Sequence, residues 1–267
     1  SFSGRVEVVK LLLDWGADVM VASNNGWTPL NSASDKGHVE VVKLLLDRGA
    51  DVTVANNNGW TPMHAASLEG HVEMVKILLE NGADIEATSK DANGRTALFL
   101  AARQGHDQVI EVLLASGRST ASAEDWYGST ALFAASRNGH ARALELLLAA
   151  DDIRADSPDG FGRTLIWWAR RSGNHRVTEL LIRHAERKGA QITDSDTPMA
   201  SSPVPFDQEL PWCDACLLTI PIGCPFYCCE ICDGGTFVIC VDCSEIGVKC
   251  RDDSHALVLH EPCTTAS

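Results

Sequence analysis

Residues 59–84, GWTPMHAASLEGHVEMVKILLENGAD, contain the signals that decide the fold of most of this chain. Thr61 is a favourable helix N-cap, because its hydroxyl accepts an unpaired backbone N–H, and Pro62 suits the first helical position. Gly70 is expected to end this helix in a left-handed conformation. The apolar run from Val75 to Leu79 predicts a second helix. The stretch therefore predicts a unit of two helices joined by a tight turn.

The same signals recur along the chain. Gly-His begins at residues 37, 70, 105 and 139, and a degenerate copy begins at residue 173, so the spacings are 33, 35, 34 and 34 residues. A Gly-x-Thr signal precedes each copy, and apolar runs follow each copy. Gly-Ala-Asp turns at residues 16, 49 and 82 are expected to start hairpin fingers that reach toward the next unit.

An in-phase period of about 33 residues with these motifs resembles the ankyrin repeat. The resemblance implies an α-solenoid of helix–turn–helix units and β-hairpins over residues 1–186, in about five and a half copies. The first copy lacks its inner helix, so Val8, Val9, Leu12 and Leu13 are expected to be partly uncovered. We therefore expect this chain to be a fragment that continues upstream.

Bulk composition narrows the function. The net charge of −14 disfavours nucleic-acid binding, which needs a basic face to displace counterions. No apolar run is long enough to span a membrane, and no signal peptide opens the chain. With 45% hydrophobic residues, the chain has the composition of a soluble globular protein. We expect a monomer inside the cell, in the cytoplasm or nucleus.

All ten cysteines lie between Cys213 and Cys263, after a Ser- and Pro-rich linker at residues 187–211. Cys-x-x-Cys pairs begin at residues 213, 229 and 240, and Cys250, His255 and His260 follow. Each pair can supply two thiolates to one tetrahedral ion, so the spacing predicts two Zn²⁺ ions. A disulfide framework is the alternative if the protein is secreted.

The tail at residues 212–263 resembles a ZZ-type zinc finger of the kind that ends fungal ankyrin-repeat proteins. The resemblance is carried by Cys213-Asp214-Ala215-Cys216, by the later Cys-x-x-Cys pairs, and by Cys250 with His255. It implies a cross-brace of two sites. The implied ligands of one ion are Cys213, Cys216, Cys240 and Cys243; those of the other are Cys229, Cys232, Cys250 and His255, with His260 in reserve.

ZZ fingers grip peptide N-termini with acidic side chains, and Asp214 is the matching residue here. The later acids of that family site are replaced by Thr236-Phe237-Val238-Ile239, which favours a structural or differently selective finger. Cys224, Cys228 and Cys263 are surplus to the ligand pattern and are expected to be inert thiols.

In ankyrin arrays the inner helices and finger tips line a groove that binds partners. Aromatic and arginine side chains are the usual anchors of such surfaces. Trp167 is expected to pack in the core. The residues expected to be exposed in the groove and to bind a partner are Trp126, Tyr127 and Trp168, with Arg103 and Arg137.

These features favour a non-catalytic protein-interaction module, with the groove as one docking surface and the finger as a second. No phosphate loop, nucleophile elbow or His-Glu-x-x-His motif is present. Two alternatives stay open: a ubiquitin-ligase-like cross-brace, or the recognition end of a signalling protein whose nucleotide-switch domain lies outside this chain. A RING finger would end in another Cys-x-x-Cys, where this chain has Cys250 and His255.

Overall fold

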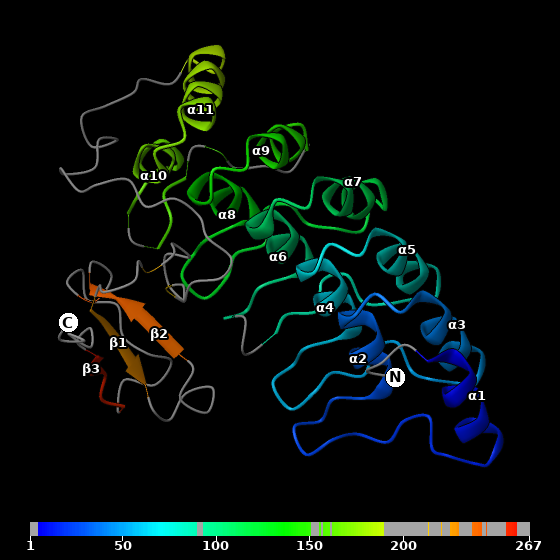
Figure 1. Cartoon of the computed structure of the whole chain (residues 1–267). Coiled ribbons are helices and arrows are strands. Elements are labelled where there is room, and N and C mark those ends of the chain that lie inside the picture. The colour runs from blue at the N-terminus through cyan, green and yellow to red at the C-terminus, as the bar shows by residue number, and fades with distance from the viewer. Residues whose placement is uncertain are drawn as a thin grey trace, which may run out of the picture. The chain divides into compact units, whose positions relative to one another are not determined.

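The computed structural model describes residues 5–89, 93–150, 155, 157–160, 162–189, 213, 220, 225–229, 237–241, 244 and 255–260 (Figure 1). Two compact units make up the chain. One comprises Ser1–Trp126 with Thr130–Leu132 and Arg142–Arg154; the other comprises Tyr127–Ser129, Phe133–Ala141 and Ala155–Ser267. The domain limits predicted from sequence, 1–186, 187–211 and 212–263, stay predictions.

Helices alternate between short inner ones and longer outer ones in the described part of the repeats. None of the described helices has the length and apolar character needed to cross a membrane. Their bounds are α1 Val6–Asp14, α2 Pro29–Asp35, α3 Val39–Asp47, α4 Pro62–Leu68, α5 Val72–Glu80, α6 Ala97–Gln104, α7 Asp107–Ala115, α8 Ala131–Arg137, α9 Ala141–Leu148, α10 Leu165–Ser172 and α11 His175–Arg187.

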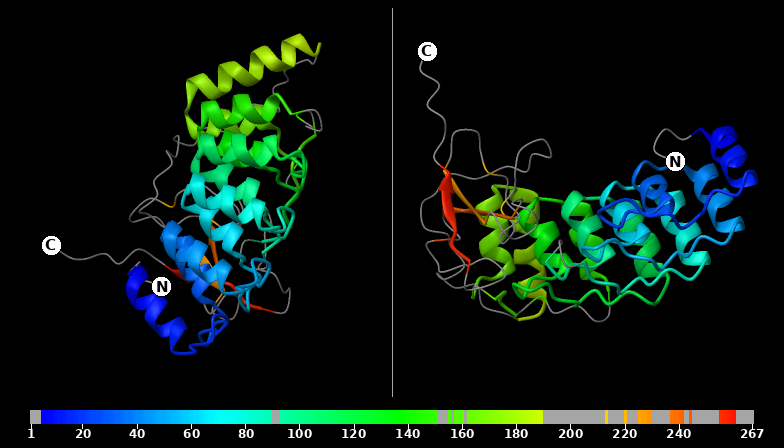
Figure 2. Two further views of the ribbon diagram at one scale, coloured as in Figure 1. Left: turned by 90° about the vertical axis from the view of Figure 1, so that its right-hand side faces the viewer. Right: turned by 90° about the horizontal axis from the view of Figure 1, so that it is seen from below.

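Helices α1–α7 form two layers in the first unit (Figure 1). The inner helices α2, α4 and α6 pack side by side, and each packs on its own outer helix, α3, α5 or α7. The outer helices, beginning with α1, also pack in chain order. The segments that link α3 to α4 and α5 to α6 gather on one side of the helices (Figure 2). This arrangement confirms the predicted stacking of helix pairs.

The inner helices begin as their sequences predict. Thr61 accepts the backbone N–H of His64, whose Nδ1 accepts the backbone N–H of Thr61 in return at 3.2 Å. His64 Nε2 bonds the carbonyl of Arg95 in the next copy at 3.2 Å. Asn31 replaces His64 in the preceding copy and makes the same two kinds of contact, with Thr28 and with the carbonyl of Trp60. Both ring nitrogens of His64 therefore have structural partners, one within its own copy and one in the next.

The glycine of each Gly-His signal lies in the left-handed region, with φ between 67° and 76°. At Gly70, for example, φ is 76°, a value that glycine adopts without steric cost. The space beside Gly37 and Gly70 is also filled, because a Cβ there would lie within 3 Å of the ring of His71 or His106. These rings bond the carbonyls of Asp35 and Leu68, which ties each helix pair to the one before it.

We use the name fingers for the segments that link one helix pair to the next, residues 15–28, 48–61, 81–96, 116–130 and 149–164. They contain turns and extended backbone, and the described parts of the fingers hold one isolated β-bridge, between Ser89 and Arg95, rather than the expected β-hairpins. Neighbouring fingers are joined by single backbone hydrogen bonds, as from Asn57 N–H to Asn25 O at 3.1 Å.

Part of the predicted exposure of α1 is confirmed. Val8 and Leu12 are exposed and Leu13 is half-buried, but Val9 is buried, so the expectation for Val9 is wrong. Val9 is buried because α1 packs on α3 with one side of its apolar stripe.

The described residues of the tail form a small antiparallel sheet. Its strands are β1 Phe226–Cys229, β2 Phe237–Cys240 and β3 Val258–His260, in the order β2-β1-β3. Tyr227 pairs with Ile239 on one side and with Leu259 on the other. The predicted linker lies outside the described residues beyond residue 189.

Candidate functional site

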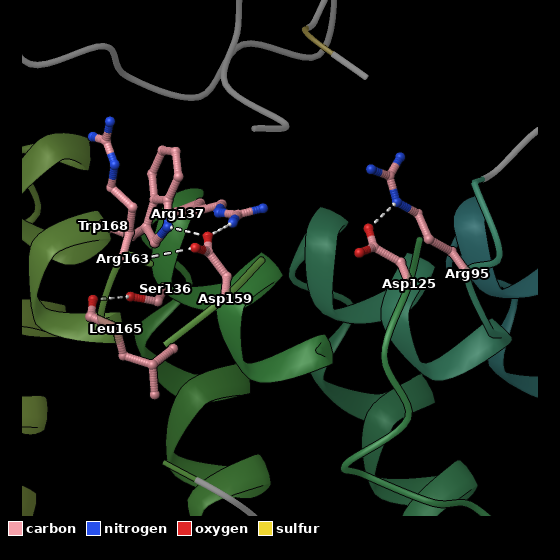
Figure 3. A network of polar contacts seen from close by, with 8 residues as sticks. All are labelled: Arg95, Asp125, Ser136, Arg137, Asp159, Arg163, Leu165 and Trp168. Atoms are coloured by element: carbon pink, nitrogen blue, oxygen red, sulfur yellow. Dashed lines mark hydrogen bonds and ion pairs between the residues drawn. The ribbon is translucent and has the colours of Figure 1, made fainter. Parts of the chain in front are cut away.

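A buried polar cluster occupies the inner side of the second unit. Asp159 accepts a hydrogen bond from Trp168 Nε1 at 2.7 Å, another from the backbone N–H of Arg163 at 3.0 Å, and an ion-paired bond from the guanidinium of Arg137 (Figure 3). The Arg137 guanidinium also lies 4.1 Å from the centre of the Trp168 ring. The side chains of Asp159, Arg137 and Trp168 thus hold one another in place within the fold.

A second buried ion pair joins two fingers of the first unit. Arg95 Nε donates to Asp125 Oδ2 at 3.0 Å, and the guanidinium lies 5.0 Å from the ring centre of Phe99 (Figure 3). Removing one partner of such a pair leaves an uncompensated buried charge. Besides apolar side chains, the interior of the described repeats therefore contains the ion pairs Arg95–Asp125 and Arg137–Asp159.

Sequence analysis missed Asp125 and Asp159, although their position carries a signal. Both stand three residues before the glycine of a Gly-x-Thr signal, as Asn56 does. The Asn56 side chain accepts the backbone N–H groups of Asn58 and Trp60, at 2.9 and 2.8 Å. Asp159 likewise accepts a backbone N–H with one oxygen and bonds Arg137 with the other, and Asp125 at the equivalent position bonds Arg95.

The exposure expected for three predicted groove residues is wrong. Arg103, Arg137 and Trp168 are buried. Of the two adjacent tryptophans, Trp168 is buried, and its indole N–H bonds Asp159. Trp167 was expected in the core but is half-buried beneath the guanidinium of Arg163. A binding role for these three residues stays untested, and burial removes them from the surface on which a partner would dock.

Trp126 and Tyr127 keep part of the exposure that was expected of groove residues. Trp126 is 53% exposed at the tip of its finger, and Tyr127 is half-buried. The backbone N–H of Trp126 bonds the carbonyl of Asn93 at 2.9 Å, which fixes the finger tip. Asp214, the acidic candidate, lies outside the described residues.

Four of the predicted metal ligands are described, together with the reserve residue His260. Cys213 and Cys229 are buried, Cys240 is half-buried, and Cys229 Sγ lies 3.8 Å from His255 Nδ1. Zn–S and Zn–N bonds of about 2.3 and 2.0 Å at a tetrahedral angle place sulfur and nitrogen about 3.5 Å apart. Cys229 and His255 therefore fit as ligands of one ion.

Cys228 and His260 form a different kind of contact on neighbouring strands. Cys228 Sγ lies 2.9 Å from His260 Nε2, and the ring of Phe226 stacks on the imidazole at 5.3 Å. This separation is shorter than the roughly 3.5 Å that a shared tetrahedral zinc requires. Sequence analysis missed the pair, because strand register rather than chain spacing brings the two residues together.

The remaining predicted ligands, Cys216, Cys232, Cys243 and Cys250, lie outside the described residues. Among the residues that the structure does describe, no three potential ligands gather in one place. The two-ion arrangement thus stays a prediction, supported at one point by the distance between Cys229 and His255.

Comparison with protein families gives one match. A family model described as ankyrin repeats, in three copies, matches residues 1–89 and 85–159, together more than half of the chain. No curated protein matches the chain.

Proposed function

This chain belongs to the ankyrin-repeat family, and on that premise we propose that it is a non-catalytic module that binds a protein partner through its repeats. Repeats of this family generally mediate protein–protein interactions. We further propose that the tail is a ZZ-type finger of the fungal kind that serves as a second docking surface. The monomeric state and a location inside the cell remain predictions.

The proposal rests on a contrast in the described repeats: polar groups are buried and hydrogen-bonded, whereas one large aromatic side chain is exposed. The groups best suited to chemistry are held in structural contacts: both ring nitrogens of His64 are bonded, and Asp159 takes three hydrogen bonds inside the fold. The large aromatic Trp126 is instead exposed on the side where the fingers lie. This distribution suits recognition of another surface better than turnover of a substrate.

Binding is tested with the full chain as bait. Captured proteins are identified, the best candidate is purified, and its titration by isothermal calorimetry should give a saturable one-to-one complex. The matched bait carries Leu45→Ala, which is expected to loosen the repeats without changing the surface, and should bind less well. If no purified candidate binds saturably, the proposed function is wrong.

For the tail, we propose two structural zinc ions. Cys213, Cys216, Cys240 and Cys243 would hold one; Cys229, Cys232, Cys250 and His255 would hold the other. The ions would supply folding free energy, since some fifty residues bury too little apolar surface to fold unaided. The 3.8 Å separation of Cys229 Sγ and His255 Nδ1, together with the direct contact of His260 with Cys228, favours His255 over His260 as the ligand.

Elemental analysis of protein purified in reducing buffer tests this assignment. We expect two zinc ions per wild-type chain, one in the His255→Ala variant and two in the His260→Ala variant. Excess chelator should remove both ions and leave the helical circular-dichroism signal of the repeats intact. Absence of zinc from the wild type, or cysteines found bonded to one another by mass spectrometry, would contradict the proposal.

A further inference from the structure

Trp126 occupies a position that the fold fills elsewhere with small residues. It stands two residues before the glycine of its Gly-x-Thr signal, where the other described copies have Asn24, Asn57 and Gly160. The Asn57 and Gly160 backbones make the same link to the preceding finger as Trp126 does, at 3.1 and 2.9 Å. The fold thus needs the backbone at this position and accepts asparagine or no side chain at all.

The Trp126 ring is nevertheless held in place. A Cβ added to Gly94 would lie 2.5 Å from both Cδ1 and Nε1 of the indole, so one edge of the ring packs against that glycine. Asn57 packs against Gly26 in the same way. The neighbouring residue Asp125 is fixed by its buried ion pair with Arg95. An exposed aromatic that is already ordered loses little conformational entropy when a partner binds.

Among the described residues of fingers 81–96 and 116–130, exposed and half-buried acidic side chains outnumber the exposed basic ones. In the finger pair that contains Trp126, the exposed or half-exposed acidic residues are Asp84, Glu86 and Glu124, and the exposed basic residue among those described is Arg118. Glu86 accepts the backbone N–H of Thr120 at 2.9 Å, which places its charge between the two fingers of the pair.

We propose that Trp126 anchors the docking of a basic protein segment, with an arginine or lysine side chain seated on the exposed face of the indole. A cation over a tryptophan ring is attracted by the ring quadrupole, and the exposed carboxylates of these two fingers favour the same charge. This inference rests on the proposed function, since it names the chemistry of the partner that the repeats would bind.

The test uses the full chain and a fluorescent twelve-residue peptide of alternating arginine and serine, followed by anisotropy at low salt. Trp126→Asn installs the residue that the fold accepts at position 57 and leaves the net charge unchanged. Non-specific attraction to the acidic chain is therefore preserved, and we expect the affinity to fall roughly tenfold. Gly94→Ala should also weaken binding, because the new Cβ displaces the ring.

Two controls make the outcome specific. Trp15, 80% exposed directly after the end of α1, offers an exposed indole at a different position, and Trp15→Asn should leave peptide binding unchanged. The melting temperature of Trp126→Asn should equal that of the wild type. Peptides with leucine or glutamate in place of arginine should bind at least tenfold more weakly than the arginine peptide.

Equal binding of the arginine peptide by Trp126→Asn and wild type would overturn the inference, as would equal binding of the leucine peptide. The proposed function fails separately, if the wild-type chain forms no saturable complex with any purified protein. A purified partner that binds wild type and Trp126→Asn equally well would contradict the anchoring role of Trp126 and would support the proposed protein-binding function.

Discussion

Helices α1 and α3 have the same nine residues, VEVVKLLLD, in two different environments. In α3, Val41 and Leu45 are 0% and 1% exposed; their counterparts in α1, Val8 and Leu12, are 48% and 49% exposed. Helix α3 packs against α1, α2 and α5, whereas α1 packs against α3. An identical apolar period thus gives the same helix twice, and neighbouring helices decide how much of it is buried.

The largest expected difference comes from truncating the same leucine in both helices. Leu45→Ala removes a buried side chain and leaves a cavity, so we expect the free energy of unfolding to fall by about 4 kcal/mol. Leu12→Ala should cost less than about 1 kcal/mol, because half of that side chain already contacts water. Urea unfolding followed by circular dichroism measures the loss in both variants. Equal losses would contradict the conclusion that neighbouring helices decide how much of each helix is buried.

Acid should destabilise the helix pair α4–α5, which contains His64, and spare the pair α2–α3, which has Asn31 at the equivalent position. Burial lowers the pKa of His64 to about 4 from 6.5, so the folded protein resists protonation of this ring. Since the folded pKa is the lower one, stability is complete above pH 6.5 and falls as the pH drops toward 4. The loss at the acid end should reach about 3 kcal/mol.

The matched variant for this pH dependence is His64→Asn, which installs the residue that completes the capping box of α2 at position 31. Its free energy of unfolding should change little between pH 6.5 and 4.5, while the wild-type value falls. Denaturation midpoints measured across that range compare the two proteins. An equally steep loss in both would assign the acid sensitivity to another group.

Removing a cap should have a smaller effect. Thr28 caps α2, the helix that covers α3, and Thr28→Ala should lower the free energy of unfolding by about 1 kcal/mol. Arg5 occupies the N-cap of α1 without a side-chain hydrogen bond to the helix, so Arg5→Ala should have no measurable effect. Thermal melts of the two variants test the pair, and similar melting temperatures would argue against the cap.

The smallest effect is expected at the ion pair that links the two helices. Arg48 Nη2 lies 2.7 Å from Asp14 Oδ1, and both side chains are partly exposed. Asp14→Asn should cost less than about 0.5 kcal/mol, and the difference should vanish at high salt. Asp47→Asn is the control, because the corresponding Asp47 of α3 has no ion pair among the described residues. A loss that persists at high salt would point to a packing role.

Local features of the repeats were predictable from sequence, and long-range ones were not. The caps Thr28 and Thr61 and the left-handed Gly70 follow from chemistry within a few residues of each, and all three were correct. The exposure of Arg137 and Trp168 was predicted from repeat position alone and was wrong, because Asp159, on the next finger, pairs with both.

In the tail, chain spacing predicted the metal-ligand chemistry but not the contact between Cys228 and His260. That contact depends on the antiparallel register of β1 and β3, which pairs Phe226 with His260 and brings residues about thirty positions apart within reach. Cys229 and His255 meet in the same small sheet region at 3.8 Å, so the ligand prediction gained support from register rather than from spacing.

The amino-acid sequence by itself determined the period, the helix boundaries and the stacking of pairs, because caps, glycines and apolar stripes act over less than two helical turns. Only the tertiary structure decided which copy of VEVVKLLLD is covered, which tryptophan is buried, and which arginines are paired inside the fold. Burial and ion pairing depend on what lies opposite a side chain, and residues distant in the chain supply that neighbour.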